Sequence, residues 1–183
     1  MKIFVIFGKA KSGKDTVAKM IQKNLINYNL RPCIMHITSP LYTYAKNHFN
    51  WDETKEEKPR ALLQELGIEI IEQKLNKKYF LLNRLKEDIE ILNNFFDTFI
   101  IADTRLKKEY DYLKETYPNI VTIKIERNSY ESNLTEKEQK HITETEIDSI
   151  NNFNYIIYNN SKESLKNQVN SIIENEIKGV NYE

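Results

Sequence analysis

The stretch of this sequence that decides the fold is Phe7-Gly8-Lys9-Ala10-Lys11-Ser12-Gly13-Lys14-Asp15-Thr16. It follows an apolar run over residues 1–6, which has the composition of a buried parallel strand. Residues 17–25 come after it and place apolar side chains at helical spacing on one face. The order of strand, glycine-bounded loop and helix is the context of a phosphate-binding loop, in which backbone N–H groups and the positive end of the helix dipole face an anion.

The loop residues have separable tasks in this interpretation. Gly8 and Gly13 let the backbone curl, and Lys14 supplies a positive charge for the terminal phosphates of a nucleotide. The residue after the loop lysine is usually Ser or Thr, but here it is Asp15, followed by Thr16. A carboxylate can hold Mg²⁺ directly or through water, and the Thr16 hydroxyl would then reach an inner phosphate. The alternative is a tight, lysine-rich strand-to-helix turn that binds nothing.

The composition indicates a single domain and excludes several classes of protein. A chain of 183 residues is long enough for one core, and its 27 basic residues balance its 27 acidic ones, so no net field draws it to nucleic acid or to a membrane. The single Cys33 suits a reducing cytoplasm. The N-terminal apolar run is too short for a signal peptide or a membrane span. We therefore expect a cytoplasmic protein that binds neither nucleic acid nor membranes.

Apolar runs and helical periodicity alternate along the rest of the chain. Further strands are predicted at residues 31–37, 98–103, 120–125 and 155–158. Helices are predicted at residues 41–48, 59–75, 79–95, 107–115 and 161–173. This alternation predicts an α/β fold of three layers, in which a five-stranded parallel sheet has helices on both faces.

Two stretches depart from the alternation. Residues 40–96 contain no strand pattern and are predicted to form a helical insertion. Residues 128–147 are polar and highly charged. Such a charged stretch is commonly a solvated surface helix, but its position between two core strands favours a lid that closes over the ligand.

Ligands of parallel α/β sheets bind beyond the carboxyl ends of the strands. This rule places Ser39, Asp103, Arg105, Arg127 and Asn159 on one rim with the phosphate loop. Asp103 ends an apolar strand, where phosphate-loop proteins place a carboxylate for magnesium, although a strand-end Asp that caps a turn is the alternative. Arg105 would screen charge as a phosphoryl group moves. The catalytic candidates are therefore Lys14, Asp103 and Arg105.

Four segments match the motifs of one family in that family's order. Residues 8–16, Gly-Lys-Ala-Lys-Ser-Gly-Lys-Asp-Thr, resemble the P-loop of the phage-type deoxynucleoside monophosphate kinases. Residues 58–69 are similar to that family's Pro-Arg…Leu-Leu-Gln…Leu-Gly-Thr-Glu segment. Asp103-Thr104-Arg105…Glu109 resembles its Asp-Val-Arg…Asn-Glu, and residues 141–144 resemble its His-x-Ser-Glu.

This resemblance implies a P-loop kinase fold, with ATP and Mg²⁺ as cofactors and a (deoxy)nucleoside monophosphate as phosphate acceptor. The 40–96 insertion would bind the acceptor. The candidates for ATP binding are Gly8, Lys11, Ser12, Gly13, Lys14, Asp15, Thr16 and Arg127. The candidates for acceptor binding are Ser39, Arg60, Glu69, Arg105 and His141, and those for magnesium are Asp15, Thr16 and Asp103. Such kinases can be homodimers, although no stretch of this sequence demands one.

Two alternatives stay open at this stage. Ile68 replaces the family's Thr, and the arginine expected soon after Glu69 is absent. The animal-type phosphomevalonate kinases resemble this chain in Lys-Ser-Gly-Lys-Asp and in Asp-Thr-Arg after a strand, and their acceptor is an isoprenoid phosphate. The third hypothesis is a regulatory ATPase or binding module with no small-molecule acceptor. The long insertion with its own arginine argues against a mere switch, and the Leu-Leu-Gln…Leu-Gly element favours the nucleotide.

Overall fold

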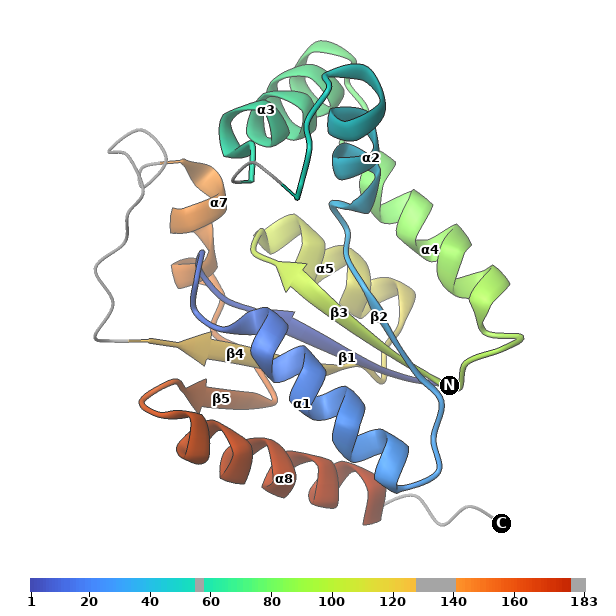
Figure 1. Ribbon diagram of the computed structural model, residues 1–183, viewed down its shortest axis with the longest axis vertical. Coiled ribbons are helices and arrows are strands. Elements are labelled where there is room, and N and C mark those ends of the chain that lie inside the picture. Colours follow the sequence, from blue (N-terminus) through green and yellow to red (C-terminus); the bar gives the residue numbers. More distant parts are fainter. Residues whose placement is uncertain (55–57, 128–140, 179–183) are drawn as a thin grey trace.

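The computed structural model describes residues 1–54, 58–127 and 141–178. Within them the chain forms one parallel sheet (Figure 1). The strands are β1 (Lys2–Phe7), β2 (Pro32–Met35), β3 (Thr98–Thr104), β4 (Val121–Glu126) and β5 (Tyr155–Tyr158). Their order across the sheet is β2-β3-β1-β4-β5, and all neighbouring pairs are parallel. The predicted five-stranded parallel sheet is confirmed.

Helices cover both faces of the sheet (Figure 1). Helices α1 (Lys14–Asn27) and α8 (Lys162–Lys178) lie on one face, and α4 (Phe80–Leu92) and α5 (Lys107–Thr116) lie on the other. Because successive side chains of a strand point to opposite faces, Phe4 and Ile6 join the core under α1 and α8. Ile3 and Val5 join the core under α4 and α5. The predicted three-layer α/β architecture is confirmed.

The helical insertion consists of α2 (Ser39–His48), α3 (Arg60–Gln64), a π-helix (Glu65–Lys74) and α4. Its first part, up to the π-helix, lies beyond the carboxyl ends of the strands, and α4 returns along the face of the sheet (Figure 1). The sequence predicts one helix over residues 59–75, but only its first turn is α-helical. The apolar spacing of so short a stretch does not separate i→i+4 from i→i+5 hydrogen bonding. Gly67 of the π-helix approaches α2 so closely that a Cβ would lie 3.1 Å from Leu41 Cδ1.

Helix α2 begins two residues before the helix predicted at residues 41–48. Its N-cap is Thr38, and Pro40 lies in its first turn. β2 ends at Met35 rather than at Ile37. Residues 36–38 instead form a turn, in which the N–H groups of Ile37 and Thr38 donate to Asp103 of β3.

Helix α7 (Ile142–Thr145) and a 3₁₀ turn (Glu146–Ser149) lie between β4 and β5. Residues 128–140 of the predicted lid lie outside the described residues. The remainder packs on the core, since Ile147 is 1% exposed and belongs to the cluster under α4 and α5. Among the helices that the structure describes, none is long and apolar enough to cross a membrane.

Candidate active site

The loop between β1 and α1 is braced from two neighbouring strands. Gly13 has φ +107°, where only glycine is unstrained, and a Cβ there would lie 2.6 Å from Asn159 Nδ2. That Asn159 amide, just after β5, donates to the Ser12 carbonyl at 2.8 Å. Arg127, just after β4, donates from Nη1 to the Lys11 carbonyl at 3.2 Å. The curled shape of the loop is therefore held by residues more than a hundred positions away.

Lys14 is the first residue of α1 and lies inside the loop. Its Nζ donates to the carbonyls of Gly8 and Lys9 at 2.6 and 2.9 Å. Burial lowers the pKa of Lys14 to about 7, and the nearby Arg105 guanidinium acts in the same direction. The Ser12 hydroxyl is buried and has no hydrogen-bond partner in the part of the chain that the structure describes. A buried lysine, an unpartnered hydroxyl and the first turn of a helix together fit a phosphate group.

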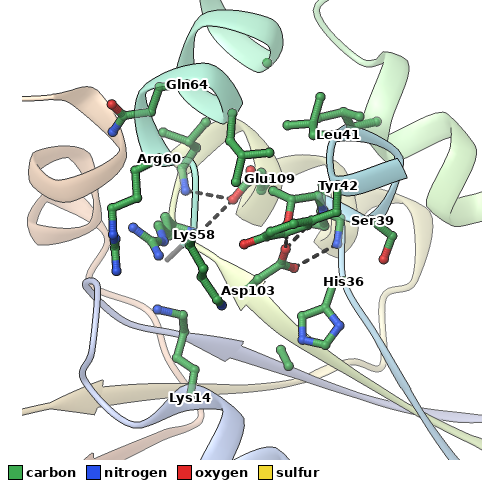
Figure 2. A pocket seen from close by; sticks show the side chains of 18 of the residues that line it. Lys14, His36, Ser39, Leu41, Tyr42, Lys58, Arg60, Gln64, Asp103 and Glu109 are labelled. Carbon is green, nitrogen blue, oxygen red and sulfur yellow. Dashed lines mark hydrogen bonds between the residues drawn. The ribbon is translucent and has the colours of Figure 1, made fainter. Parts of the chain in front are cut away.

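A cavity of about 1520 Å³ extends from this loop to the helical insertion. Its polar lining includes Lys14, Asp15 and Thr16 at the loop, Asp103 and Arg105 at the end of β3, and Ser39, Lys58 and Arg60 on the insertion. Figure 2 shows Lys14, Lys58 and Arg60 directed toward the same space. Pockets for one small molecule usually measure about 300–1000 Å³, so this cavity has room for two.

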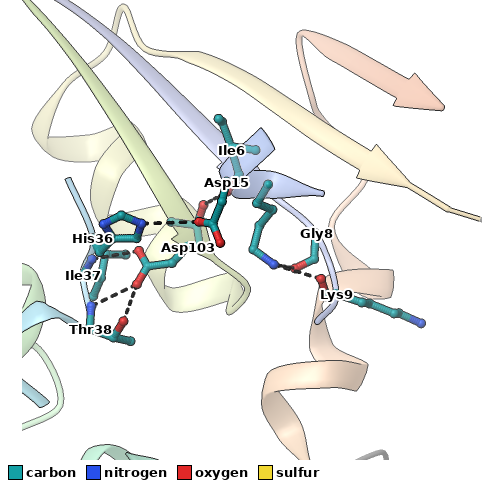
Figure 3. A network of polar contacts seen from close by, with 10 residues as sticks. Ile6, Gly8, Lys9, Asp15, His36, Ile37, Thr38 and Asp103 are labelled. Atoms are coloured by element: carbon teal, nitrogen blue, oxygen red, sulfur yellow. Dashed lines mark hydrogen bonds and ion pairs between the residues drawn. The ribbon is translucent and has the colours of Figure 1, made fainter. Parts of the chain in front are cut away.

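The Asp103 carboxylate is bound to the turn that precedes α2 (Figures 2 and 3). Its Oδ1 accepts from the Ile37 N–H at 2.8 Å, and its Oδ2 accepts from the Thr38 N–H and hydroxyl at 3.0 and 2.5 Å. Because β2 pairs with β3 so that Met35 faces Ile101, residue 37 lies level with Asp103. The carboxylate thus attaches the insertion to the sheet. The interpretation of Asp103 as a magnesium ligand stays a prediction.

Arg105 is held through its backbone and through its side chain. The N–H groups of Arg105 and Leu106 donate to Glu109 Oε2 at 2.7 and 2.9 Å, which caps the start of α5. Removal from water raises the pKa of Glu109 to about 7. The Arg105 guanidinium pairs with Glu144, whose side chain is 7% exposed. The other Glu144 oxygen accepts from the Ala10 N–H of the phosphate loop at 2.8 Å.

Asp15 and His36 face each other at the edge of the cavity (Figure 3). Their Oδ1 and Nε2 atoms are 3.5 Å apart, and the Asp15 side chain is 64% exposed. This contact lowers the pKa of Asp15 and raises the pKa of His36. In the described chain no three His, Cys, Asp or Glu side chains gather as a metal site. A magnesium ion at Asp15 would therefore take most of its ligands from phosphate and water, as this ion commonly does.

The structure separates two of the predicted acceptor residues from the others. Ser39, Arg60 and Arg105 line the main cavity, whereas Glu69 and His141 line a neighbouring hollow of about 660 Å³. An ion pair between Lys108 and Glu72 stands where the two hollows meet, and both residues line both of them. The periodicity of the sequence could not predict this separation, because it does not show on which side of the Lys108–Glu72 ion pair a residue of the insertion lies.

Sequence reasoning also passed over three residues that belong to the site. Lys58 adjoins the Pro59-Arg60 motif, which was the available signal for it. His36 lies near the end of the strand predicted at residues 31–37, and no local pattern indicates that its partner is Asp15. Glu144 was noticed only as the last residue of a motif, and nothing local indicates that it reaches the phosphate loop.

Comparison with known proteins agrees with this geometry. The family model described as deoxynucleotide monophosphate kinase matches residues 41–169, which is well over half of the chain. The matched range includes the insertion and the end of β3 but not the phosphate loop. No curated protein sequence matches the chain.

Several solved kinases share the fold. A sugar kinase from Janibacter sp. is 12% identical with a TM-score of 0.56, covering 97% of this chain and 95% of that one. A gluconokinase from Sinorhizobium meliloti 1021 is 13% identical, with a TM-score of 0.53 and 98% of each chain covered. An APS kinase from Mycobacterium tuberculosis, in complex with AMPPNP and APS, is 11% identical, with a TM-score of 0.52 and coverage of 94% and 95%. Identities this low show the fold alone. Together with the family match, they establish that the chain is a phosphotransferase with a P-loop kinase fold and belongs to the deoxynucleotide monophosphate kinase family.

Proposed function

We propose that the protein transfers the terminal phosphoryl group of ATP to the phosphate of a deoxynucleoside monophosphate, giving the diphosphate and ADP. The observation that carries this proposal is one cavity lined by cations from three parts of the fold. Lys14 comes from the phosphate loop, Lys58 and Arg60 come from the insertion, and Arg105 directly follows β3. A site for one anion needs no second set of cations from a separate insertion, whereas transfer between two phosphates does.

The residues divide the work according to their positions. An acceptor phosphate is already a nucleophile, so the protein must align two anions and screen their charge. Lys14 and the loop N–H groups bind the donor phosphates, while Ser39, Lys58 and Arg60 hold the acceptor. Arg105 stabilises the charge between them.

Magnesium and the two aspartates complete the proposed site. Magnesium, when bound, neutralises charge on the donor phosphates. Asp15 and the neighbouring Thr16 would hold it, which is supported by the exposed Asp15 carboxylate and by the position of both residues in the cavity lining. Asp103 keeps the turn before α2 on the sheet, so that the acceptor end of the cavity keeps its position.

A coupled ADP-release assay tests the proposal. The acceptors are the four common deoxynucleoside monophosphates and mevalonate phosphate, with one reaction that contains none. We expect release that depends on at least one deoxynucleoside monophosphate. Strict dependence on mevalonate phosphate would replace the nucleotide as acceptor, and release without any acceptor would favour a regulatory ATPase. Lys14→Ala should abolish release, while Lys23→Ala, on an exposed part of the same helix, should leave it unchanged.

A further inference from the structure

Glu144 is an acidic side chain buried against a loop built to bind anions. It is 7% exposed, and its two carboxylate oxygens have different partners. Oε2 accepts from the Ala10 N–H at 2.8 Å, and Oε1 pairs with the Arg105 guanidinium. Ala10 lies within the phosphate loop, between Gly8 and Gly13. The carboxylate therefore bridges the loop and Arg105, which lines the main cavity.

The groups that bind Glu144 are also those that suit a phosphoryl oxygen. A loop N–H and a guanidinium are the donors that phosphate commonly takes in such sites. Glu144 also favours the charged form of Lys14, as a bound phosphate would. Because both ligands are anions and use the same hydrogens, a phosphoryl group and the Glu144 carboxylate cannot occupy these donors together.

The segment around Glu144 is fixed by contacts that do not involve its carboxylate. Glu146 Oε2 accepts from the Lys107 N–H at 2.9 Å, and Asp148 pairs with Lys9 Nζ at 2.6 Å. Ile147 is buried in the core. Rotation of the Glu144 side chain alone can therefore free the donors, without unfolding of the segment that carries it.

We propose that Glu144 is an internal competitor of ATP, whose carboxylate occupies the phosphoryl position of the empty phosphate loop and is displaced when the nucleotide binds. This inference rests on the proposed function, since it takes the loop to be the ATP site. It implies that the measured ATP affinity is the intrinsic affinity multiplied by the fraction of empty molecules in which the carboxylate is not bound. In the empty enzyme, the Glu144 carboxylate keeps Arg105 paired and holds the phosphate loop in the shape that it has when ATP is bound.

Calorimetric titration with MgATP tests this with three variants of the full chain. Glu144→Ala removes the competitor and should bind MgATP about tenfold more tightly than the parent, the change expected when roughly one charge-assisted hydrogen bond no longer competes. Glu144→Gln keeps the size and shape of the side chain but not its charge, and should bind more tightly by a smaller factor. Glu146→Gln is the matched control, because it removes the same charge from the same segment without touching the loop, and should change affinity less than about twofold.

The possible results separate the two proposals. If the parent binds MgATP and both Glu144 variants bind it no more tightly, Glu144 is not a competitor, while the proposed function stands. If Glu146→Gln tightens binding as much as Glu144→Ala does, a general field effect replaces displacement. If neither the parent nor any variant binds MgATP, the loop is not the ATP site and the proposed function fails. Urea unfolding of each variant confirms that the titrated protein is folded, and Glu144→Gln carries the test if the alanine variant is not.

Discussion

Replacing Asp103 by alanine should destabilise the fold even when no metal or nucleotide is present, whereas replacing Asp15 should not. Both residues are predicted from the sequence to bind magnesium, but their surroundings differ. The Asp103 carboxylate accepts three hydrogen bonds from Ile37 and Thr38. The Asp15 carboxylate is 64% exposed and lies 3.5 Å from His36 Nε2. The two substitutions therefore separate attachment of the insertion from metal binding.

The expected loss follows from these contacts. A hydrogen bond to a charged group contributes about 1.5–3 kcal/mol. The three bonds share one carboxylate, and water from the cavity replaces part of their effect, so their contributions do not add. We therefore expect a total loss of about 3 kcal/mol. An exposed pair such as that of Asp15 contributes about 0.5 kcal/mol or less. With a urea dependence of about 2 kcal/mol/M, Asp103→Ala should lower the unfolding midpoint by about 1.5 M.

The assay is urea unfolding in EDTA, followed by circular dichroism. Thr38→Val is a graded control, because it removes only the hydroxyl donor and should cost about 1 kcal/mol. Asp15→Ala should keep the parent's midpoint but raise the magnesium concentration needed for activity. The reasoning is refuted if Asp103→Ala loses less than about 1 kcal/mol in EDTA and is impaired only in its magnesium dependence. Asp103 would then be the metal ligand that the sequence suggests.

Three further predictions concern the loop, the transfer step and pH. Gly13→Ala should cost about 2 kcal/mol of stability because φ is +107° and the new Cβ meets Asn159 Nδ2 at 2.6 Å. Urea unfolding should show a smaller loss when Gly13→Ala is made in an Asn159→Ala background. Strictly additive losses would contradict the clash. Arg105→Ala should lower turnover about 10³-fold, and Arg105→Lys should not restore it, because lysine lacks the planar fork; a loss of less than about tenfold would remove Arg105 from the transfer machinery. The folded Glu109 carboxyl has a pKa of about 7, against an ordinary value of 4.5. Between pH 4.5 and pH 7 the folded state therefore binds more protons at this group than the unfolded state does. The contribution of Glu109 to the free energy of unfolding thus falls as pH rises. Glu109→Gln lacks this penalty, so its free energy of unfolding relative to the parent should increase from pH 5 to pH 8 in urea titrations, and a difference that stays constant would show that Glu109 titrates normally.

The sequence by itself determined the sheet and the position of the phosphate loop. Both can be predicted from patterns among residues that are near neighbours along the chain. Continuous apolar runs such as residues 98–103 are stable only when buried on both faces, and helical spacing after Gly13 requires a helix there. The residues at the carboxyl ends of the strands could also be predicted to lie together, because parallel strands end at the same edge of the sheet whatever their order.

Only the tertiary structure decided which partner each charged side chain takes. Asp103 binds Ile37 and Thr38 because β2 lies next to β3, and the strand order is not written in any local pattern. Glu144 reaches Ala10 across 134 positions of sequence, and its flanking residues look like an ordinary charged surface segment. A carboxylate takes the nearest donors that folding supplies, so its chemistry depends on distances between segments that periodicity does not encode.

The phosphate loop illustrates both sides of this division. Its glycines and its lysine were recognisable from spacing, since the turn needs them whatever surrounds it. The hydrogen bonds of the loop to Asn159 and Glu144 could not be recognised from the sequence, because folding brings the end of β5 and α7 beside the loop. The turn of the loop was thus determined locally, while the residues that contact it were decided by the packing of the whole chain.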